Sequence, residues 1–498
     1  MRHLAVVVVI GAFIGGVALA ETAVRPAFVR VSPRDPRYFE LADGRPYIPI
    51  GLNLIAPDGA RGGGETNGLN RMDEWIKKLA DQGGNYIRVW LSSPFWDVEH
   101  KQSGVYDETR ARRIDALLEI ARRRDVRVKL TLEHFRSIDG PGRQAWAHKP
   151  LHTVARGGTA TNIADFFDGQ ASRDLFRRKL AWYAKRYPDN PTIYGWELWN
   201  EINAVAGGDY MSWTESMLPE LHRLFPHNLA MQSLGSFDRD SELPAYRRLT
   251  LMPDIVLDSV RSSYRRLSLM PGNDVAQVHR YLDLGAALEV CHGPVDVLAA
   301  DAVRELLAWH PERPVILAES GAVEPNHAGP FKLYATDRQG IILHDILFAP
   351  FFAGAAGPGQ CWHWDQYVDR NNLWHHFGRF AAAVKDLDPP SEQFQPRMLP
   401  HERLRIYALA GRQTILLWCR DAQNTWQTEL RDDRKPELLT KVTLDLAQVL
   451  AKQTIAETRV YDPWENRWTD ARIEGQTLVF PEFSRSLVVR IGLDSKPR

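Results

Sequence analysis

The feature of this chain that most restricts its fold is a regular alternation of short apolar runs with amphipathic helical segments, from residue 46 onward. Amphipathic helices are expected, for example, at 108–124 and 173–187. The eight apolar runs lie at 47–54, 86–91, 126–132, 192–198, 229–234, 275–281, 315–318 and 355–362. Such alternation is typical of parallel strands joined by crossover helices. It predicts an α/β protein with a (β/α)8 TIM barrel over residues 21–387, and a doubly wound sheet is the alternative.

The pattern changes after residue 387. Residues 388–400 (DPPSEQFQPRMLP) are rich in proline and are predicted to form a linker. Residues 401–498 contain only short β-branched and apolar runs separated by turn residues, which predict a small antiparallel β-sandwich domain. We expect this domain to support the barrel rather than to bind a ligand.

The first twenty residues have the features of a secretory signal peptide. Arg2 precedes an apolar run at 4–19, and Ala18 and Ala20 are small residues at the positions that a signal peptidase reads. The run is shorter than the roughly 20 apolar residues that cross a bilayer. We therefore expect cleavage after Ala20 and a secreted or periplasmic mature protein that is not bound to a membrane.

Charge and cysteine content argue against several classes of partner. The 62 Lys and Arg residues balance 62 Asp and Glu residues, so the total charge does not indicate a nucleic-acid partner. The three cysteines, Cys291, Cys361 and Cys419, match neither a disulfide framework nor a zinc site in their spacing. We expect no metal, no cofactor and a monomeric protein.

Two glutamates follow apolar runs at positions where a barrel carries its active site. Residues 195–201 (GWELWNE) end the fourth run with Asn200 and Glu201 beside two tryptophans, and residues 315–321 (VILAESG) carry Glu319 after the seventh run. Apolar surroundings raise the pKa of a carboxyl group and favour a general acid. Since the fourth and seventh strands lie on opposite sides of a barrel mouth, the two carboxylates are expected to face each other, as glycoside hydrolysis requires.

These motifs resemble clan A of the glycoside hydrolases, and most closely glycoside hydrolase family 5. The resemblance covers residues 28–387 and includes residues 37–41 (RYFEL), which precede the first strand. It implies a retaining double displacement with Glu319 as the nucleophile and Glu201 as the acid/base. The implied partner is a carbohydrate, namely a plant- or microbial-type polysaccharide or oligosaccharide, with β-mannan or β-glucan favoured.

The resemblance also implies roles for other residues. Asn200 would bond the 2-hydroxyl of the sugar, Arg88 would keep the nucleophile ionised, and Tyr281 would donate a hydrogen bond to it. A tryptophan in residues 360–365 (QCWHWD) would form a platform beneath the sugar, and the sequence does not choose between Trp362 and Trp364, although Trp364 is nearer the mouth. The other candidate pocket residues are His279, His134, Asn53, Trp199 and Asp365.

Other functions remain open on the sequence. A metal-dependent barrel hydrolase usually carries His-x-His on its first strand, where this chain has GLN at 51–53. A non-catalytic carbohydrate-binding barrel would need the aromatic residues but not both glutamates, and a transglycosidase would use the same two glutamates. The segment 136–170, which carries Trp146, is expected to be a loop that walls the cleft. The resemblance implies an enzyme like the endo-mannanases and cellulases, and exo action is the alternative if this loop and the insertion between the fifth and sixth strands close one end of the cleft.

Overall fold

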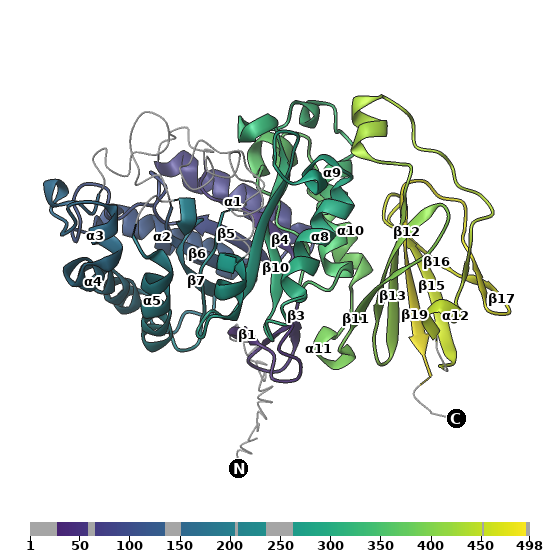
Figure 1. Cartoon of the computed structure of the whole chain (residues 1–498), viewed down its shortest axis with the longest axis horizontal. Helices are drawn as coiled ribbons and strands as arrows, with labels where there is room; N and C mark the ends of the chain where they lie inside the picture. The colour runs from purple at the N-terminus through teal and green to yellow at the C-terminus, as the bar shows by residue number, and fades with distance from the viewer. Residues whose placement is uncertain are drawn as a thin grey trace, which may run out of the picture.

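The computed structural model describes residues 27–57, 65–134, 151–204, 208–235, 262–450 and 453–494. The predicted signal peptide and Trp146 lie outside these ranges. Figure 1 shows a barrel of strands and helices beside a C-terminal part that consists mainly of strands.

Seven of the eight predicted barrel strands are regular parallel strands. β4 (Gly51–Asn53), β5 (Tyr86–Trp90), β6 (Arg127–Glu133), β7 (Ile193–Trp199) and β8 (Leu229–Met231) pair in that order, and β9 (Ala276–Asp283) pairs with β10 (Val315–Val323). All residues of β5, β6 and β7 are buried, as expected for a parallel sheet that is covered on both faces.

The ring of strands closes through contacts that are not regular ladders. Cys361, in the eighth predicted strand, bridges to Ser320 of β10 and accepts from the amide of Asn53 in β4 at 3.0 Å. On the other side, β8 meets β9 through Asp274, whose carboxylate accepts from the amide of Ala230 at 2.7 Å. These contacts complete a (β/α)8 barrel, as predicted.

Helices cover the outside of the barrel. They include α1 (Glu65–Asp81), α2 (Glu108–Arg123), α4 (Gln170–Arg186), α5 (Tyr210–Leu224), α8 (Val295–Leu307), α9 (Ile341–Phe352) and α10 (His375–Ala383). Asp107 precedes α2 as its N-cap, and its carboxylate accepts from amides of the first turn. The helix buries the predicted Ile114 and Leu117. Among the helices of the described ranges, none is long and apolar enough to cross a membrane.

Three sequence expectations about segment boundaries are wrong. The first apolar run is split, because β1 (Val29–Val31), β2 (Phe39–Leu41) and β3 (Pro46–Tyr47) form a separate antiparallel sheet. The predicted loop 136–170 contains η2 (Val154–Arg156) and α3 (Ile163–Asp168). The predicted linker 388–400 contains α11 (Pro389–Glu392), capped by Asp388, and β11 (Gln395–Leu399), an edge strand of the C-terminal sheet where Pro396 is tolerated.

The C-terminal part contains one large and one small antiparallel sheet. The large sheet has the order β11, β12 (Leu404–Ala410), β13 (Thr414–Asp421), β19 (Ser486–Leu493), β15 (Ile455–Asp462) and β16 (Arg467–Asp470). The small sheet consists of β14 (Thr443–Asp445), β18 (Thr477–Val479) and β17 (Arg472–Glu474), and α12 (Ala447–Leu450) follows β14. Leu417 of the large sheet and Leu478 of the small sheet belong to one apolar cluster, which is consistent with the expected β-sandwich.

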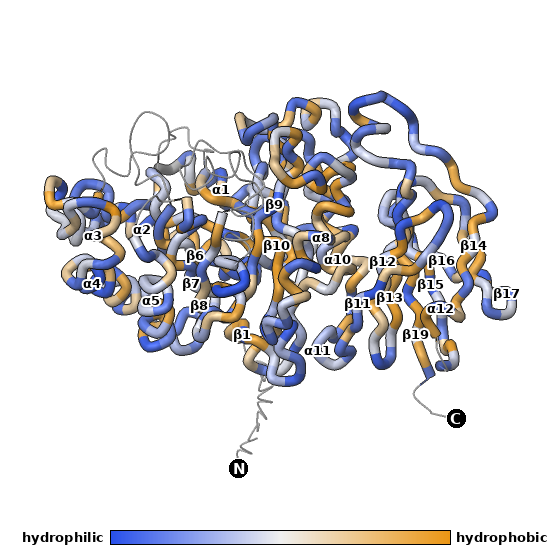
Figure 2. Tube along the Cα trace, in the orientation of Figure 1, coloured by the Kyte–Doolittle hydropathy of each residue, from blue (hydrophilic) through white to orange (hydrophobic). Residues whose placement is uncertain are grey.

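The C-terminal sheet covers a barrel helix that has no exposed face. All 12 residues of α9 are buried, and ten of them are apolar. A helix that is apolar on nearly every side has to be covered by other elements. Phe348 of α9 stacks on Trp418 of β13 with ring centroids 5.8 Å apart. Figure 2 shows apolar segments both in the barrel helices α8 and α10 and in the neighbouring strands β12 and β13. Tyr407 and Val488 of the sheet belong to the same apolar cluster as the barrel core.

Replacing Asp345 of α9 by alanine is expected to lower the free energy of unfolding by about 3–5 kcal/mol. Asp345 accepts from the guanidinium of Arg420 in β13 at 2.8 Å, and both side chains are buried, so the variant leaves a buried charge without its partner. Denaturant unfolding would measure the loss. In the matched control, Asp81→Ala, the exposed partner Lys77 stays hydrated, and a change within about 1 kcal/mol is expected. Equal losses in the two variants would contradict this account.

Candidate active site

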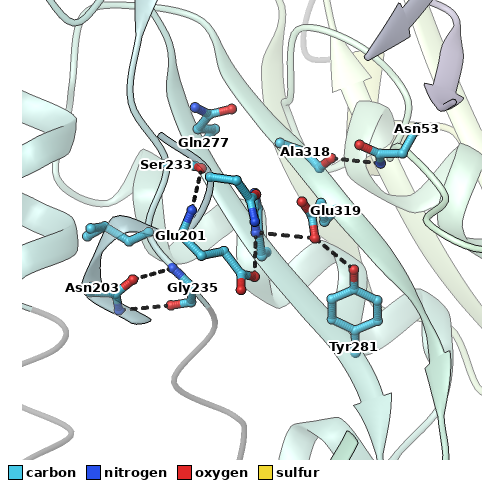
Figure 3. Close-up of polar contacts among 12 residues, drawn as sticks. Asn53, Glu201, Asn203, Ser233, Gly235, Gln277, Tyr281, Ala318 and Glu319 are labelled. Atoms are coloured by element: carbon cyan, nitrogen blue, oxygen red, sulfur yellow. Dashed lines mark hydrogen bonds and ion pairs between the residues drawn. The ribbon is translucent and has the colours of Figure 1, made fainter. Parts of the chain in front are cut away.

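Glu201 stands at a sharp turn, two residues after the end of β7. Its φ is +49°, in the left-handed region that is costly for any residue except glycine. The turn is held by its amide, which donates to the buried hydroxyl of Ser233 at 3.1 Å, and η3 (Ile202–Ala204) follows. Figure 3 shows that the Glu201 side chain therefore points across the barrel mouth towards Glu319.

His279 of β9 lies between the two glutamates. Its Nδ1 is 2.9 Å from Oε1 of Glu201 and 3.5 Å from Oε2 of Glu319. One carboxylate oxygen of Glu201 and one of Glu319 lie within 4.8 Å of each other, and all three side chains are buried. The two glutamates that were predicted to face each other are therefore brought together.

Glu319 is held from two sides. It lies inside β10 rather than at its end, at a bulge where the register with β9 shifts, and a bulge can re-aim a side chain. The hydroxyl of Tyr281 donates to Oε2 at 2.9 Å, and Nη1 of Arg88 donates to Oε1. Figure 3 shows the Tyr281 contact. Both carboxylate oxygens therefore have fixed donors.

Arg88 links the nucleophile candidate to the residues around it. Besides Glu319, its guanidinium donates to the Asn200 side-chain carbonyl at 2.7 Å and to Glu197 at 2.6 Å and 2.9 Å. Burial alone would lower the pKa of Arg88, but the charges of Glu197 and Glu319 outweigh burial and raise it above its ordinary value. Arg88 is therefore a permanent buried cation at the centre of the site.

Asn200 presents a donor to the site. Its side-chain carbonyl accepts from Arg88, so its Nδ2 points elsewhere. This buried Nδ2 has no hydrogen-bond partner among the described residues. A buried polar group without a partner is costly, and a ligand hydroxyl beside the two glutamates would satisfy it.

Glu197 is a charged residue of the barrel interior to which the sequence analysis gave no role. It accepts from Arg88 and from Thr131, the latter at 2.5 Å, and from Gln277 at 2.9 Å. Burial alone would raise the pKa of Glu197, but the charges of Arg88 and Lys129 hold it well below its ordinary value. The sequence does contain an indication of this role, because Glu197 is a charged residue within the apolar run 192–198. It lies an even number of residues before Glu201, and alternate residues of a strand point to the same face.

An aromatic group flanks Arg88. Trp90, which the sequence analysis missed, has its ring centroid 4.6 Å from that of His134 and 4.9 Å from that of Trp362. Trp364 meets Trp362 edge-on and lies in η7 (Trp364–Asp369), where the chain no longer follows strand parity. Of the two tryptophans predicted as the sugar platform, Trp362 is therefore the one whose ring contacts Trp90.

Three candidate pocket residues have other roles. Trp199 is fully buried in an aromatic cluster with Phe166 of α3 and Trp213 of α5. Asn53 donates to the carbonyl of Ala318 at 3.1 Å, as Figure 3 shows, and thus ties β4 to β10. Asp365 accepts from the neighbouring amide of Gln366 in η7 at 2.8 Å. In the structure Trp199 thus packs in an aromatic cluster and Asn53 ties two strands together, and their predicted contact with substrate stays a prediction.

Among the described residues, two buried clusters contain the histidine and carboxylate side chains that could bind a metal ion. In each cluster a positively charged side chain already pairs with the carboxylates. Glu201, His279 and Glu319 lie beside the guanidinium of Arg88. In the other group, Glu99, Glu133 and His152, the ammonium of Lys179 is 2.9 Å from Glu99 and also pairs with Glu133. A fixed cation among the carboxylates opposes binding of a metal ion.

Comparison with known proteins decides the family. The model of the family described as Cellulase (glycosyl hydrolase family 5) matches residues 62–342, which is more than half of the chain. The chain belongs to glycosyl hydrolase family 5. This family 5 protein is therefore an O-glycosyl hydrolase, and its partner is a carbohydrate.

Relatives of this family 5 enzyme include two rice proteins. A protein named mannan endo-1,4-beta-mannosidase 5, from Oryza sativa subsp. japonica, is 26% identical over 351 residues, which are 64% of this chain and 67% of the relative. The mannan endo-1,4-beta-mannosidase 3 of the same organism is 29% identical over 180 residues, 33% of this chain and 37% of the relative. The chain thus spans little more than a third of the second relative.

Solved structures share the fold over nearly the whole length of the family 5 enzyme. A structure described as a glycoside hydrolase has a TM-score of 0.57 and 13% identity, and the match covers 95% of this chain and 98% of the other. A glycoside hydrolase family 5 structure from Bacteroides vulgatus has a TM-score of 0.54 and 13% identity, with 93% of each chain covered. At this identity the likeness shows the fold alone.

Proposed function

We propose that this family 5 enzyme is a secreted, retaining β-glycosidase that hydrolyses β-mannan, with Glu319 as nucleophile and Glu201 as acid/base. The mannan assignment is supported by the names of the rice relatives, and β-glucan is the alternative substrate. Secretion is supported by the signal-like residues 1–20.

In the first step, a carboxylate oxygen of Glu319 forms a bond to the anomeric carbon as the bond from that carbon to the leaving oxygen breaks. Glu201 gives its proton to the leaving oxygen. In the second step, Glu201 takes a proton from water, the water oxygen bonds to the anomeric carbon, and the ester bond to Glu319 breaks. Both carboxyl groups then have their starting protonation, and the sugar keeps its anomeric configuration.

The observation that carries the retaining mechanism is the close approach of the two carboxylates. One carboxylate oxygen of Glu201 and one of Glu319 lie within 4.8 Å of each other. Retaining enzymes hold the carboxyl groups about 5–5.5 Å apart, whereas inverting enzymes need about 6.5–9.5 Å to admit a water molecule. The spacing supports direct attack by Glu319.

Neighbouring residues support the charge changes of this reaction. The Tyr281 hydroxyl and the Arg88 guanidinium fix Glu319 in position, so little reorganisation is needed before attack. The free Nδ2 of Asn200 is placed to donate to a sugar hydroxyl next to the anomeric carbon. Trp90 and Trp362 provide aromatic surface beside these groups.

A panel of β-mannan, galactomannan, cellulose and mixed-linkage β-glucan tests the proposal. We expect the highest kcat/KM on a mannan, and the first product seen by proton NMR should be the β-anomer. Initial release of the α-anomer would overturn the retaining mechanism. A preference for β-glucan would overturn the mannan assignment only, and accumulation of longer oligosaccharides at high substrate concentration would indicate transglycosylation.

A further inference from the structure

A group of charged side chains lies in the barrel interior beside Glu319. Arg88, Lys129 and Glu197 come from the adjacent strands β5, β6 and β7, and their side chains are fully buried. Buried charges are costly unless they are paired. The pairing of these three charges therefore affects the position of Glu319 and Asn200, which Arg88 contacts.

Glu197 divides its two oxygens between two cations. Oε2 accepts from Arg88 Nη2 at 2.6 Å, while Oε1 lies 3.2 Å from the ammonium of Lys129. Gln277 of β9 supports the second contact, because it donates to Oε1 of Glu197 at 2.9 Å and accepts from Lys129 at 2.6 Å. The Lys129 ammonium is thus held by both an acceptor amide and a carboxylate.

The charges balance only when Lys129 is protonated. Arg88 contacts both Glu197 and Glu319, whereas Lys129 forms its ion pair with Glu197. With Lys129 charged, two cations compensate two carboxylates. With Lys129 neutral, one guanidinium must compensate both. Other titratable groups also face these residues. His279, Glu201 and Tyr281 lie around Glu319, and Tyr86 lies beside Arg88 and Glu197.

We propose that Lys129 is a positioning residue for the nucleophile Glu319, acting through Glu197 and Arg88. Its positive charge neutralises Glu197 and leaves the Arg88 guanidinium directed at Glu319 and Asn200. When Lys129 is uncharged, Glu197 attracts Arg88 more strongly. Glu319 and Asn200 then lose part of the hydrogen bonding that Arg88 gives them. The inference rests on the proposed function, because it concerns the step in which Glu319 attacks.

The proposal gives activity a defined pH dependence. Burial lowers the pKa of Lys129 to about 7, because desolvation outweighs the attraction of Glu197. A lysine is charged below its pKa, so the compensating charge is present at mildly acidic pH and is lost as the pH rises through about 7. We therefore expect kcat to fall across an ionisation near pH 7.

The first test compares pH profiles on an aryl β-glycoside for the wild type and two variants. In Lys129→Met, kcat at pH 6 should fall about tenfold or more with little change in KM, since slight misplacement of a reacting group is costly. The ionisation near pH 7 should disappear. The matched control is Lys179→Met, which removes another buried lysine that pairs with Glu133, and it should keep that ionisation.

The second test is rescue by removing the opposite charge. The double variant Lys129→Met/Glu197→Gln restores the balance of one cation and one carboxylate, and its kcat should be severalfold above that of Lys129→Met. A purely structural role predicts that the second substitution adds further loss. A double variant no more active than Lys129→Met, or a single variant that keeps the ionisation near pH 7, would overturn the proposal.

A third readout uses the wild type and does not depend on how the variants fold. The pKa of a lysine falls steeply with temperature, while that of a carboxyl group barely moves, so the ionisation near pH 7 should shift downward on warming. An ionisation that stays in place would overturn the proposal. Wild-type protein that is inactive on every β-glycoside would instead overturn the proposed function, which separates the two failures.

Discussion

Replacing Glu319 by alanine is expected to reduce kcat by about 10⁴-fold or more, a loss typical of removing a catalytic nucleophile. The variant has no group that can form the covalent glycosyl ester. Arg88 and Tyr281, which hold the carboxylate in the wild type, are donors and do not replace it. Release of the aryl group from an aryl β-mannoside would measure the loss.

External azide provides a second readout for Glu319→Ala. Azide fits the space of the missing carboxylate, bonds to the anomeric carbon as the aryloxide leaves, and should restore turnover with an α-glycosyl azide as product. The matched control is Glu324→Ala, because Glu324 follows the same strand but pairs with the exposed Lys332. This control should retain wild-type turnover. Retention of more than about a tenth of wild-type kcat in Glu319→Ala would contradict the assignment.

Replacing Glu201 by alanine is expected to give a loss that depends on the leaving group. A sugar leaving group needs the proton, so kcat on mannan should fall by about 10²–10⁴-fold, the range for general acid–base catalysis. A dinitrophenyl leaving group needs almost no protonation, so the first step should survive. The second step lacks its base, and the glycosyl ester on Glu319 should accumulate.

Rapid mixing and mass spectrometry would test this prediction. The Glu201→Ala variant should release a burst of dinitrophenol and show a protein mass increased by one glycosyl unit. Azide should now react with the accumulated ester and give a β-glycosyl azide, the opposite anomer to that from Glu319→Ala. Equal losses on mannan and on the dinitrophenyl glycoside would contradict the role of Glu201.

The parts of the fold and site that follow from local periodicity could be predicted from sequence. The apolar runs set the order of the barrel strands, and their ends set the positions of Glu201 and Glu319. Tyr281 and Arg88 contact Glu319 because parallel strands bring inward residues of similar depth together.

The remaining features depend on contacts that periodicity does not encode. The pairing of Lys129 with Glu197 requires the register between β6 and β7, which shifts near Lys129. Trp199 was expected at the mouth, but α3, within a segment predicted as a loop, covers it. The change from strand to η7 turns Trp364 away from the direction of Trp362, so strand parity did not apply.

The covered helix α9 also limits how this enzyme can be divided. A barrel truncated before β11 would expose Phe348 and its apolar neighbours on α9 to water. Such a contiguous hydrophobic patch promotes aggregation. We therefore expect that the barrel cannot be transferred to another protein without the C-terminal sheet. Any chimera, truncation or directed-evolution library built on this scaffold has to keep the C-terminal sheet as part of the barrel's outer wall.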